Sequence, residues 1–193
     1  MQSPTLSAVL QPMERIRRVI WLAFIGVIAI YVCVAYLMFG ARGSLGSVAP
    51  RNPLFAPFVI ISLLTAAASR WIPASLVTDR KLRELLKRDP DPESLARNPQ
   101  TGKVDPERLQ QIKMLSPQDQ RLFVAARAFF TPFVVQLAFN EAIALYGLVL
   151  SNMSRSFLPI LPFAAVALAL QLTVSPKLDP LLERAGNLLL SGP

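Results

Sequence analysis

Residues 128–150 read AFFTPFVVQLAFNEAIALYGLVL, an almost wholly apolar run that contains a single carboxylate, Glu141. A helix needs about 20 residues, at ~1.5 Å each, to cross the ~30 Å hydrocarbon core of a bilayer. The run is long enough to cross a membrane as one helix. Glu141 needs an explanation, because an ionised side chain near the bilayer centre costs on the order of 3 kcal/mol.

Three other segments have the same apolar character, at about 19–39, 54–72 and 157–175. Over the 193 residues, 53% are hydrophobic, and the mean hydropathy is +0.44. Long apolar blocks at this proportion are typical of integral membrane proteins. A cleaved signal peptide is the rival interpretation of the first segment, but its apolar run is too long for one. The sequence therefore predicts an all-α, polytopic membrane protein with four transmembrane helices.

The basic residues predict the orientation of these helices. Of the 20 Lys and Arg residues, 12 lie from Arg70 to Arg127, 3 precede the first span and 2 follow the fourth. Cytoplasmic segments of membrane proteins carry such an excess of Lys and Arg. We therefore expect the N and C termini to be cytoplasmic, in a multi-pass protein of the cell inner (plasma) membrane. Trp21 and Trp71 then fall at the inner interface, where indole rings prefer to lie.

This topology divides the chain into four parts. Residues 1–72 comprise an N-terminal interfacial segment and the first transmembrane hairpin, and residues 73–127 form a cytoplasmic segment with short helices. Residues 128–175 form the second hairpin, with spans at about 128–150 and 157–175, and residues 176–193 are a C-terminal interfacial tail. Both end segments are interpreted as interfacial because their apolar residues recur at helical spacing, and a frayed terminus is the alternative for each.

Capping residues predict where helices begin in the middle segment. Asp79, Asp105 and Ser116 each stand at such a start, the last two directly before a proline. Residues 88–104 are expected to be loop. The helix that begins after Ser116 meets no breaker before Pro132, where we expect a kink. Because its basic and acidic residues are mixed, we interpret this segment as a connector or partner surface in preference to a lipid-specific one.

The residue inventory excludes several functions. The chain has no His and one Cys, Cys33, so histidine-based metal sites and triads, Cys-rich zinc sites and an internal disulfide are ruled out. Gly102 is the only glycine of the middle segment, so a phosphate-binding glycine loop has no support. The net charge of +8 is assigned to orientation and lipid headgroups, because no aromatic residues interleave with the basic ones to bind nucleic acid. We expect no enzymatic activity and no cofactor.

The candidate site is a polar seam around Glu141. This residue lies roughly 20 Å above the inner boundary at helical rise, which is near the midplane. Gln136 and Asn140 lie on an adjoining face of the same helix, and Tyr31 of the first span should reach a similar depth. Three interpretations stay open: a neutral carboxyl that fixes helix packing, a proton- or cation-handling site, and a contact with a partner subunit.

Residues 141–150, EAIALYGLVL, resemble the carboxylate-bearing helix of the rotary ATPase proteolipids, the ring-forming c subunits. In that family a Glu-Ala pair precedes an apolar-Tyr-Gly-Leu-Val run, and the Glu binds the transported ion. The resemblance implies this role for Glu141 alone. It covers about a dozen residues, and the family's glycine-rich partner helix has no counterpart, because the first span contains only Gly26.

These features predict a small integral membrane protein that acts as a structural or accessory subunit of a larger membrane complex. The alternative is a proton- or cation-coupled transporter or channel component that uses the intramembrane carboxylate. The expected partners are the lipid bilayer and either other membrane protein subunits or further copies of this chain, with no nucleic acid.

Overall fold

The computed structural model describes residues 3–40, 53–87, 89–97 and 102–190. These residues form helices and no strand, apart from an isolated bridge between Arg97 and Val104. The all-α prediction is therefore confirmed for the described residues. In chain order the helices are α1 (Pro4–Phe39), α2 (Phe55–Leu76), α3 (Asp79–Lys87), α4 (Pro92–Ala96), α5 (Pro106–Lys113), α6 (Pro117–Ala128), α7 (Phe130–Ser154), α8 (Ile160–Leu172) and α9 (Asp179–Leu190).

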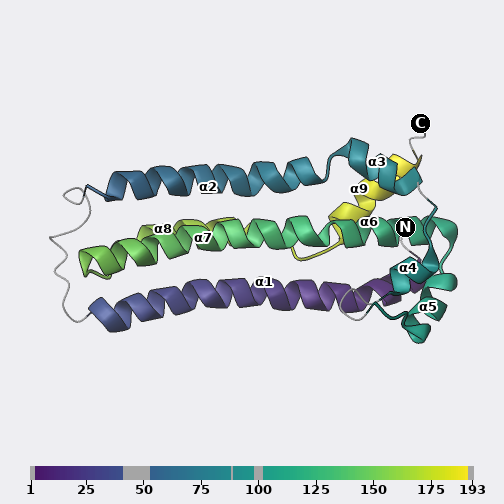
Figure 1. Ribbon diagram of the computed structural model, residues 1–193, viewed down its shortest axis with the longest axis horizontal. Helices are drawn as coiled ribbons and strands as arrows, with labels where there is room; N and C mark the ends of the chain where they lie inside the picture. Colours follow the sequence, from purple (N-terminus) through teal and green to yellow (C-terminus); the bar gives the residue numbers. More distant parts are fainter. Residues whose placement is uncertain (1–2, 41–52, 88, 98–101, 191–193) are drawn as a thin grey trace. The chain divides into compact units, whose positions relative to one another are not determined.

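The chain forms two compact units, whose helices are labelled in Figure 1. Unit 1 combines Met1–Arg18, Leu76–Thr131 and Pro176–Pro193, and unit 2 combines Val19–Ser75 with Pro132–Ser175. Unit 2 therefore contains the apolar parts of α1, α2, α7 and α8. Unit 1 contains the start of α1 and the shorter helices of the middle and the end of the chain.

Three helical stretches of the described residues are long and apolar enough to cross a membrane, as judged by length and composition. They are Pro4–Phe39, Phe55–Lys87 and Pro117–Ser154. The segment predicted as the fourth span, 157–175, contains the shorter apolar helix Ile160–Leu172, of 13 residues. A fourth crossing therefore stays a prediction.

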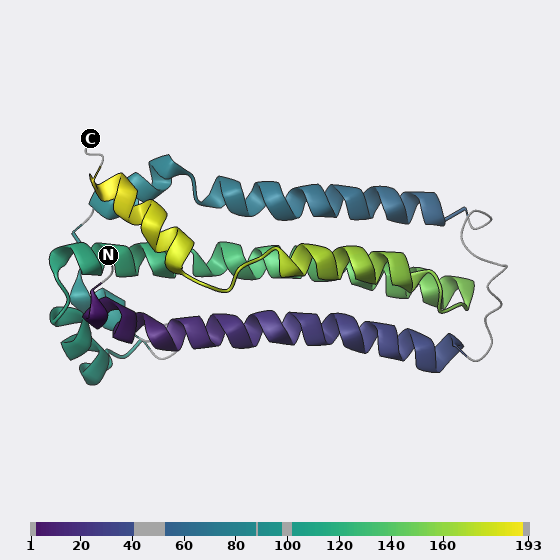
Figure 2. The same cartoon turned by 180° about the vertical axis from the view of Figure 1, so that it is seen from behind.

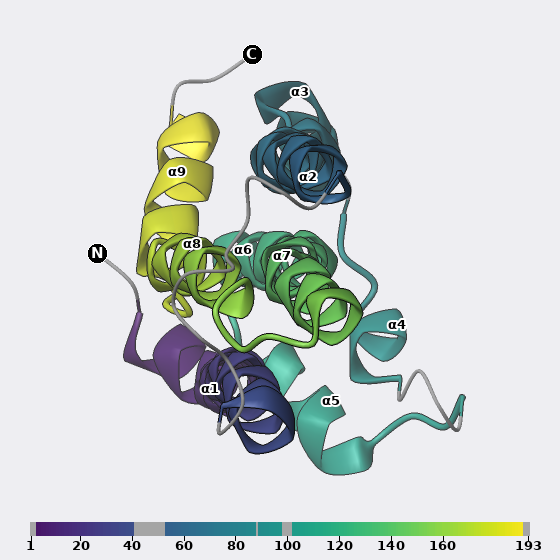
Figure 3. The ribbon, with the colours of Figure 1, turned by 90° about the vertical axis from the view of Figure 1, so that its left-hand side faces the viewer.

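In unit 2, α7 and α8 lie between α1 and α2, as the end-on view of Figure 3 shows. Successive helices run in opposite directions, which is also visible from behind in Figure 2. The apolar contacts agree with this topology: Ile28, Ile143 and Ile160 belong to one buried cluster, and Phe133 and Val174 to another. The first cluster joins the end of α1 to the end of α7 and the start of α8. The second joins the start of α7 to the residues that follow α8.

Helix α2 shows the burial pattern of a helix that lies in lipid. Its buried face carries Ser62, Thr65 and Ser69, whereas Leu63 and Leu64 are 66% and 65% exposed. In water this arrangement would be unfavourable, because apolar surface is stabilised by leaving the solvent. In lipid the outward leucines match their surroundings, and small polar residues on the inner face let neighbouring helices approach closely.

Gly147 sets the distance between α7 and α8. A Cβ atom added at this position would lie 2.7 Å from the Cβ of Phe163 and 3.1 Å from the Cα of Ile160. Both atoms are fixed to the backbone of α8, so neither can rotate away. The chain reverses beyond the end of α7 at Arg155, whose φ of 49° lies in the left-handed region.

The core of unit 1 joins both ends of the chain to its middle segment. Leu6 and Leu10 of α1, Leu178 and Leu182 near the start of α9, and Phe123 of α6 are all buried in one cluster. The interfacial location predicted for the two end segments stays a prediction, and these apolar residues pack against protein. A second cluster contains Val77, Leu82, Leu86, Ala125, Phe129 and Ala185.

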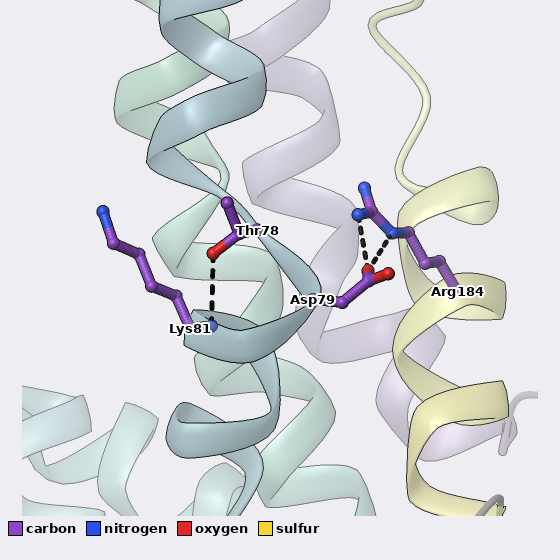
Figure 4. Close-up of polar contacts among 4 residues, drawn as sticks. All are labelled: Thr78, Asp79, Lys81 and Arg184. Atoms are coloured by element: carbon purple, nitrogen blue, oxygen red, sulfur yellow. Dashed lines mark hydrogen bonds and ion pairs between the residues drawn. The ribbon is translucent and has the colours of Figure 1, made fainter.

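The helices of the middle segment largely follow the predicted start signals. The side chain of Asp105 accepts hydrogen bonds from the N–H groups of Glu107 and Arg108 at the start of α5, and Ser116 caps α6. Helix α3 begins at Asp79, but Thr78 is the residue whose hydroxyl accepts from a backbone N–H, that of Lys81, as Figure 4 shows.

One expectation for this segment is wrong in detail. Residues 88–104 are not loop throughout, because the Asp91 side chain caps the short helix α4, which opens with a proline at its first position. The interruption expected near Pro132 is confirmed, and it lies at Phe129, the residue between α6 and α7. Pro132 has no N–H to donate to the carbonyl of Ala128, four residues earlier, so the helix breaks on the N-terminal side of the proline.

Candidate functional site

Two of the predicted site residues, Tyr31 and Glu141, are joined by a hydrogen bond in unit 2. The Tyr31 hydroxyl on α1 donates to Glu141 Oε1 on α7 at 2.6 Å. Both side chains are partly buried. None of the ion pairs among the described residues involves Glu141, so its partner within the chain is a phenol and not a cation. The contact connects α1 to α7 in a part of the protein where the hydrophobic effect does not hold helices together.

Asn140 turns to a different neighbour. Its amide Nδ2 donates to Gln171 Oε1 on α8 at 3.3 Å, and the two residues are 1% and 0% exposed. The backbone carbonyl of Gln171 in turn accepts a hydrogen bond from Trp21 Nε1 on α1 at 3.0 Å. Adjacent residues of α7 therefore contact different helices, with Glu141 directed to α1 and Asn140 to α8.

The Asn140–Gln171 pair fixes the register of α7 against α8. Among the described residues, Asn140 Oδ1 and Gln171 Nε2 have no hydrogen-bond partner although both are buried. An unpaired buried polar group costs about 1–3 kcal/mol. A slip of one helix along the other would break this hydrogen bond and leave its two atoms without each other as partners, so the pair favours the observed register.

Gln136 lies on α7 as predicted, but no hydrogen bond joins its side chain to the other predicted site residues. It is half-buried on α7, and within the described part of the chain its side chain makes no hydrogen bond. Gln171 does take part in hydrogen bonds between the helices, but it is not among the residues predicted for the site. A signal for it exists in the sequence, because Asn140 and Gln171 are equally far along the chain from the Arg155–Ser156 pair in the turn between the helices. An antiparallel hairpin places such residues opposite each other.

On the outward face of α7, the side chains next to Glu141 are small or apolar. We call this face the carboxylate strip, and its residues recur every three or four positions along the helix. Leu145 and Val149 are 40% and 39% exposed, and Ala138 is exposed beside the partly exposed Glu141. The strip comprises Ala138, Glu141, Ala142, Leu145 and Val149. A carboxyl on this face reaches the surface of the bundle of unit 2.

The described residues offer no metal site of the usual kind. They contain no group of three or more His, Cys, Asp or Glu side chains placed to hold a metal ion. Cys33 is a free thiol, exposed on α1. The polar groups that join the helices of unit 2 therefore include the carboxyl of Glu141 with the phenol of Tyr31, the amides of Asn140 and Gln171, and the Thr65 hydroxyl of α2 with the phenol of Tyr146 on α7.

Over the described residues, these features define an all-helical chain with three helices long and apolar enough to cross a membrane, and with polar contacts between its apolar helices. No known protein family, curated protein or solved structure matches it.

Proposed function

We propose that this protein is a structural or accessory subunit of a larger membrane complex, and that the carboxylate strip of α7 contacts another subunit. The observation that carries the proposal is the position of Glu141, which is bound to Tyr31 at one oxygen and lies on the outward face of the helix. Exposure of a carboxyl to hydrocarbon is costly, by about 3 kcal/mol or more when it is ionised. Contact with a partner helix removes that cost.

The residues around Glu141 support the same reading. Ala138 lies one turn before Glu141 on the strip, and Ala142 directly follows it. Because both side chains are small, the backbone of a second helix can approach α7 closely at this depth. Polar side chains of that helix would then meet the carboxyl at hydrogen-bonding distance. The partner is either a different membrane protein or a second copy of this chain.

The proposed topology has four crossings, with α8 as the fourth, and with both termini in the cytoplasm of a cell whose inner membrane holds the protein. The supporting observations are the basic residues concentrated from Arg70 to Arg127 and the close packing of α8 on Gly147. At ~1.5 Å per residue a helix of α8's length covers about 20 Å, and the residues that flank it would complete the crossing. The proposed function involves neither an enzymatic activity nor a cofactor.

The test uses one substitution at two matched positions. Ala138→Trp places a bulky ring on the carboxylate strip, and Ala67→Trp makes the same change on the outward face of α2, where Ala67 is also exposed. We expect the first variant to lose its co-purifying partner or its oligomeric mass in native nanodiscs, and the second to retain both. A wild-type chain that is a stable monomer without any co-purifying protein would refute the proposal.

A second candidate function is favoured by the hydrogen bond between Tyr31 and Glu141. A carboxyl held by a neutral donor and partly exposed can take up a proton or a cation at its other oxygen, as required of a component of a coupled transporter or channel. The resemblance of residues 141–150 to the proteolipid c subunits points the same way.

Glu141→Gln separates the two candidates, because the amide still accepts a hydrogen bond from Tyr31 but cannot ionise. If the protein handles ions, the variant should lose ion-coupled flux in liposomes while it keeps its fold and its partner. Equal flux in the variant and the wild type would exclude this second function and leave the subunit proposal intact.

A further inference from the structure

Helix α3 is amphipathic, and its apolar face is used inside unit 1. Leu82 and Leu86 are 0% and 3% exposed, and they belong to the cluster that contains Ala125 of α6, Phe129 directly after α6, and Ala185 of α9. An amphipathic helix can bind a membrane by inserting its apolar face between the lipids. α3 cannot insert its apolar face between lipids, because this face is already packed against protein.

The one acidic residue at the start of α3 is held by α9. Asp79 Oδ1 accepts hydrogen bonds from Arg184 Nε at 2.9 Å and Nη2 at 2.5 Å, and Figure 4 shows the two side chains directed toward each other. This pair offsets the charge of Asp79, and the burial of Leu82 and Leu86 fixes the rotation of α3 about its own axis. Lys81, in the same figure, extends to the opposite side of the helix from Arg184.

The remaining face of α3 carries a basic stripe. We define the α3 stripe as Arg80, Arg83, Glu84 and Lys87, which are exposed at helical spacing and line a shallow hollow of the surface together with Asp79. Its single acid, Glu84, lies 3.4 Å from Arg80, and their side chains are 59% and 90% exposed. An ion pair so exposed is weak. The stripe therefore presents a local excess of positive charge, which the mixed basic and acidic residues of the whole middle segment do not predict.

The chain keeps this stripe close to a candidate membrane span. α2 ends at Leu76 and α3 begins at Asp79. A chain covers at most about 3.6 Å per residue, so the last residue of α2 and the first residue of α3 lie within about 11 Å of each other. Trp71, in the last part of α2, is 74% exposed. Tryptophan side chains on membrane-spanning helices are enriched at the level of the lipid headgroups. If α2 crosses a bilayer, the short connection therefore keeps the start of the stripe within reach of lipid phosphate groups.

We propose that the α3 stripe binds the headgroups of anionic phospholipids in the leaflet next to the C-terminal end of α2. The guanidinium groups of Arg80 and Arg83 match phosphate oxygens with paired N–H donors, and Lys87 adds a further charge one turn on. Because the apolar face of α3 is packed inside unit 1, the recognition is electrostatic and made by side chains at the membrane surface. It is independent of the function proposed for Glu141.

The test compares two triple variants of the full-length chain that lose the same charge. Arg80→Gln/Arg83→Gln/Lys87→Gln removes the stripe, and the control Arg97→Gln/Lys103→Gln/Lys113→Gln removes three exposed cations elsewhere in unit 1. Each protein is titrated in detergent with phosphatidylglycerol or phosphatidylcholine, and the bound lipids are counted by native mass spectrometry. We expect the wild type and the control to prefer phosphatidylglycerol, and the stripe variant to bind it at least about tenfold more weakly.

A charge-conserving variant, Arg80→Lys/Arg83→Lys, guards against a loss that only reflects misfolding. It should retain the preference for phosphatidylglycerol, because lysine keeps the charge, but bind this lipid more weakly than the wild type, because an ammonium lacks the paired N–H donors. Equal binding of the two lipids by the wild type would overturn the proposal. So would an equal loss in both triple variants, which would show that the net charge of unit 1 acts and the stripe does not.

Discussion

Gly147→Ala tests the packing of α7 against α8. The added Cβ would lie 2.7 Å from the Cβ of Phe163 and 3.1 Å from the Cα of Ile160, closer than unbonded carbon atoms approach. The two helices must therefore move apart along a contact that includes the Asn140–Gln171 pair. Overpacking of this kind costs about 1–3 kcal/mol, and alanine recovers up to about 1 kcal/mol through its higher helix propensity. We expect a net loss of stability of about 1–2 kcal/mol.

The matched control is Gly26→Ala on α1. A Cβ at Gly26 would have no atom within 4 Å, so the same substitution meets open space. It should leave the stability unchanged or raise it by up to about 1 kcal/mol. Reversible unfolding in mixed micelles, followed by circular dichroism, measures both variants. The reasoning is wrong if Gly147→Ala is as stable as Gly26→Ala, because the two sites then offer the same space.

Three further predictions concern single contacts. Leu178→Ala, at a fully buried position of unit 1, should lower the free energy of unfolding by about 2–5 kcal/mol. Leu76→Ala, at a residue that is 41% exposed, should lower it by less than about 0.5 kcal/mol. Thermal unfolding of the two variants measures the difference. Asp105→Ala should cost about 1 kcal/mol and lower the hydrogen-exchange protection of α5, and Asp105→Asn should not, because asparagine also caps helices. A double-mutant cycle of Tyr31→Phe and Glu141→Leu should give a coupling energy of about 0.6–1.7 kcal/mol; additive effects would contradict the hydrogen bond between them.

The local features of this fold could be predicted from the sequence. Apolar runs long enough to cross a bilayer indicated helices at α1, α2 and α7, and the caps at Asp105 and Ser116 marked where α5 and α6 begin. Each of these signals depends on residues within a few turns of one another. The short helix α4 was missed because three prolines close to it in the sequence favour a loop, and only its capping by Asp91 reveals it.

The candidate site was predictable as a set of residue types near one depth, but not as a set of contacts. That Glu141 is unusual follows from its apolar surroundings alone, whereas its bond to Tyr31 depends on how α1 is rotated against α7. The pairing of Asn140 with Gln171 depends in addition on the register of the α7–α8 hairpin, which Gly147 and the turn at Arg155 set together.

The sequence by itself therefore determined that this chain is helical, where its apolar helices lie and which residue in them is out of place. Only the tertiary structure decided that the two ends of the chain join the middle segment in one core, that the apolar face of α3 is buried so that its basic stripe faces outward, and that Glu141 and Asn140 turn to different helices. The physical reason is that helix formation depends on hydrogen bonds four residues apart. Helix rotation and register depend on contacts between residues far apart in the chain.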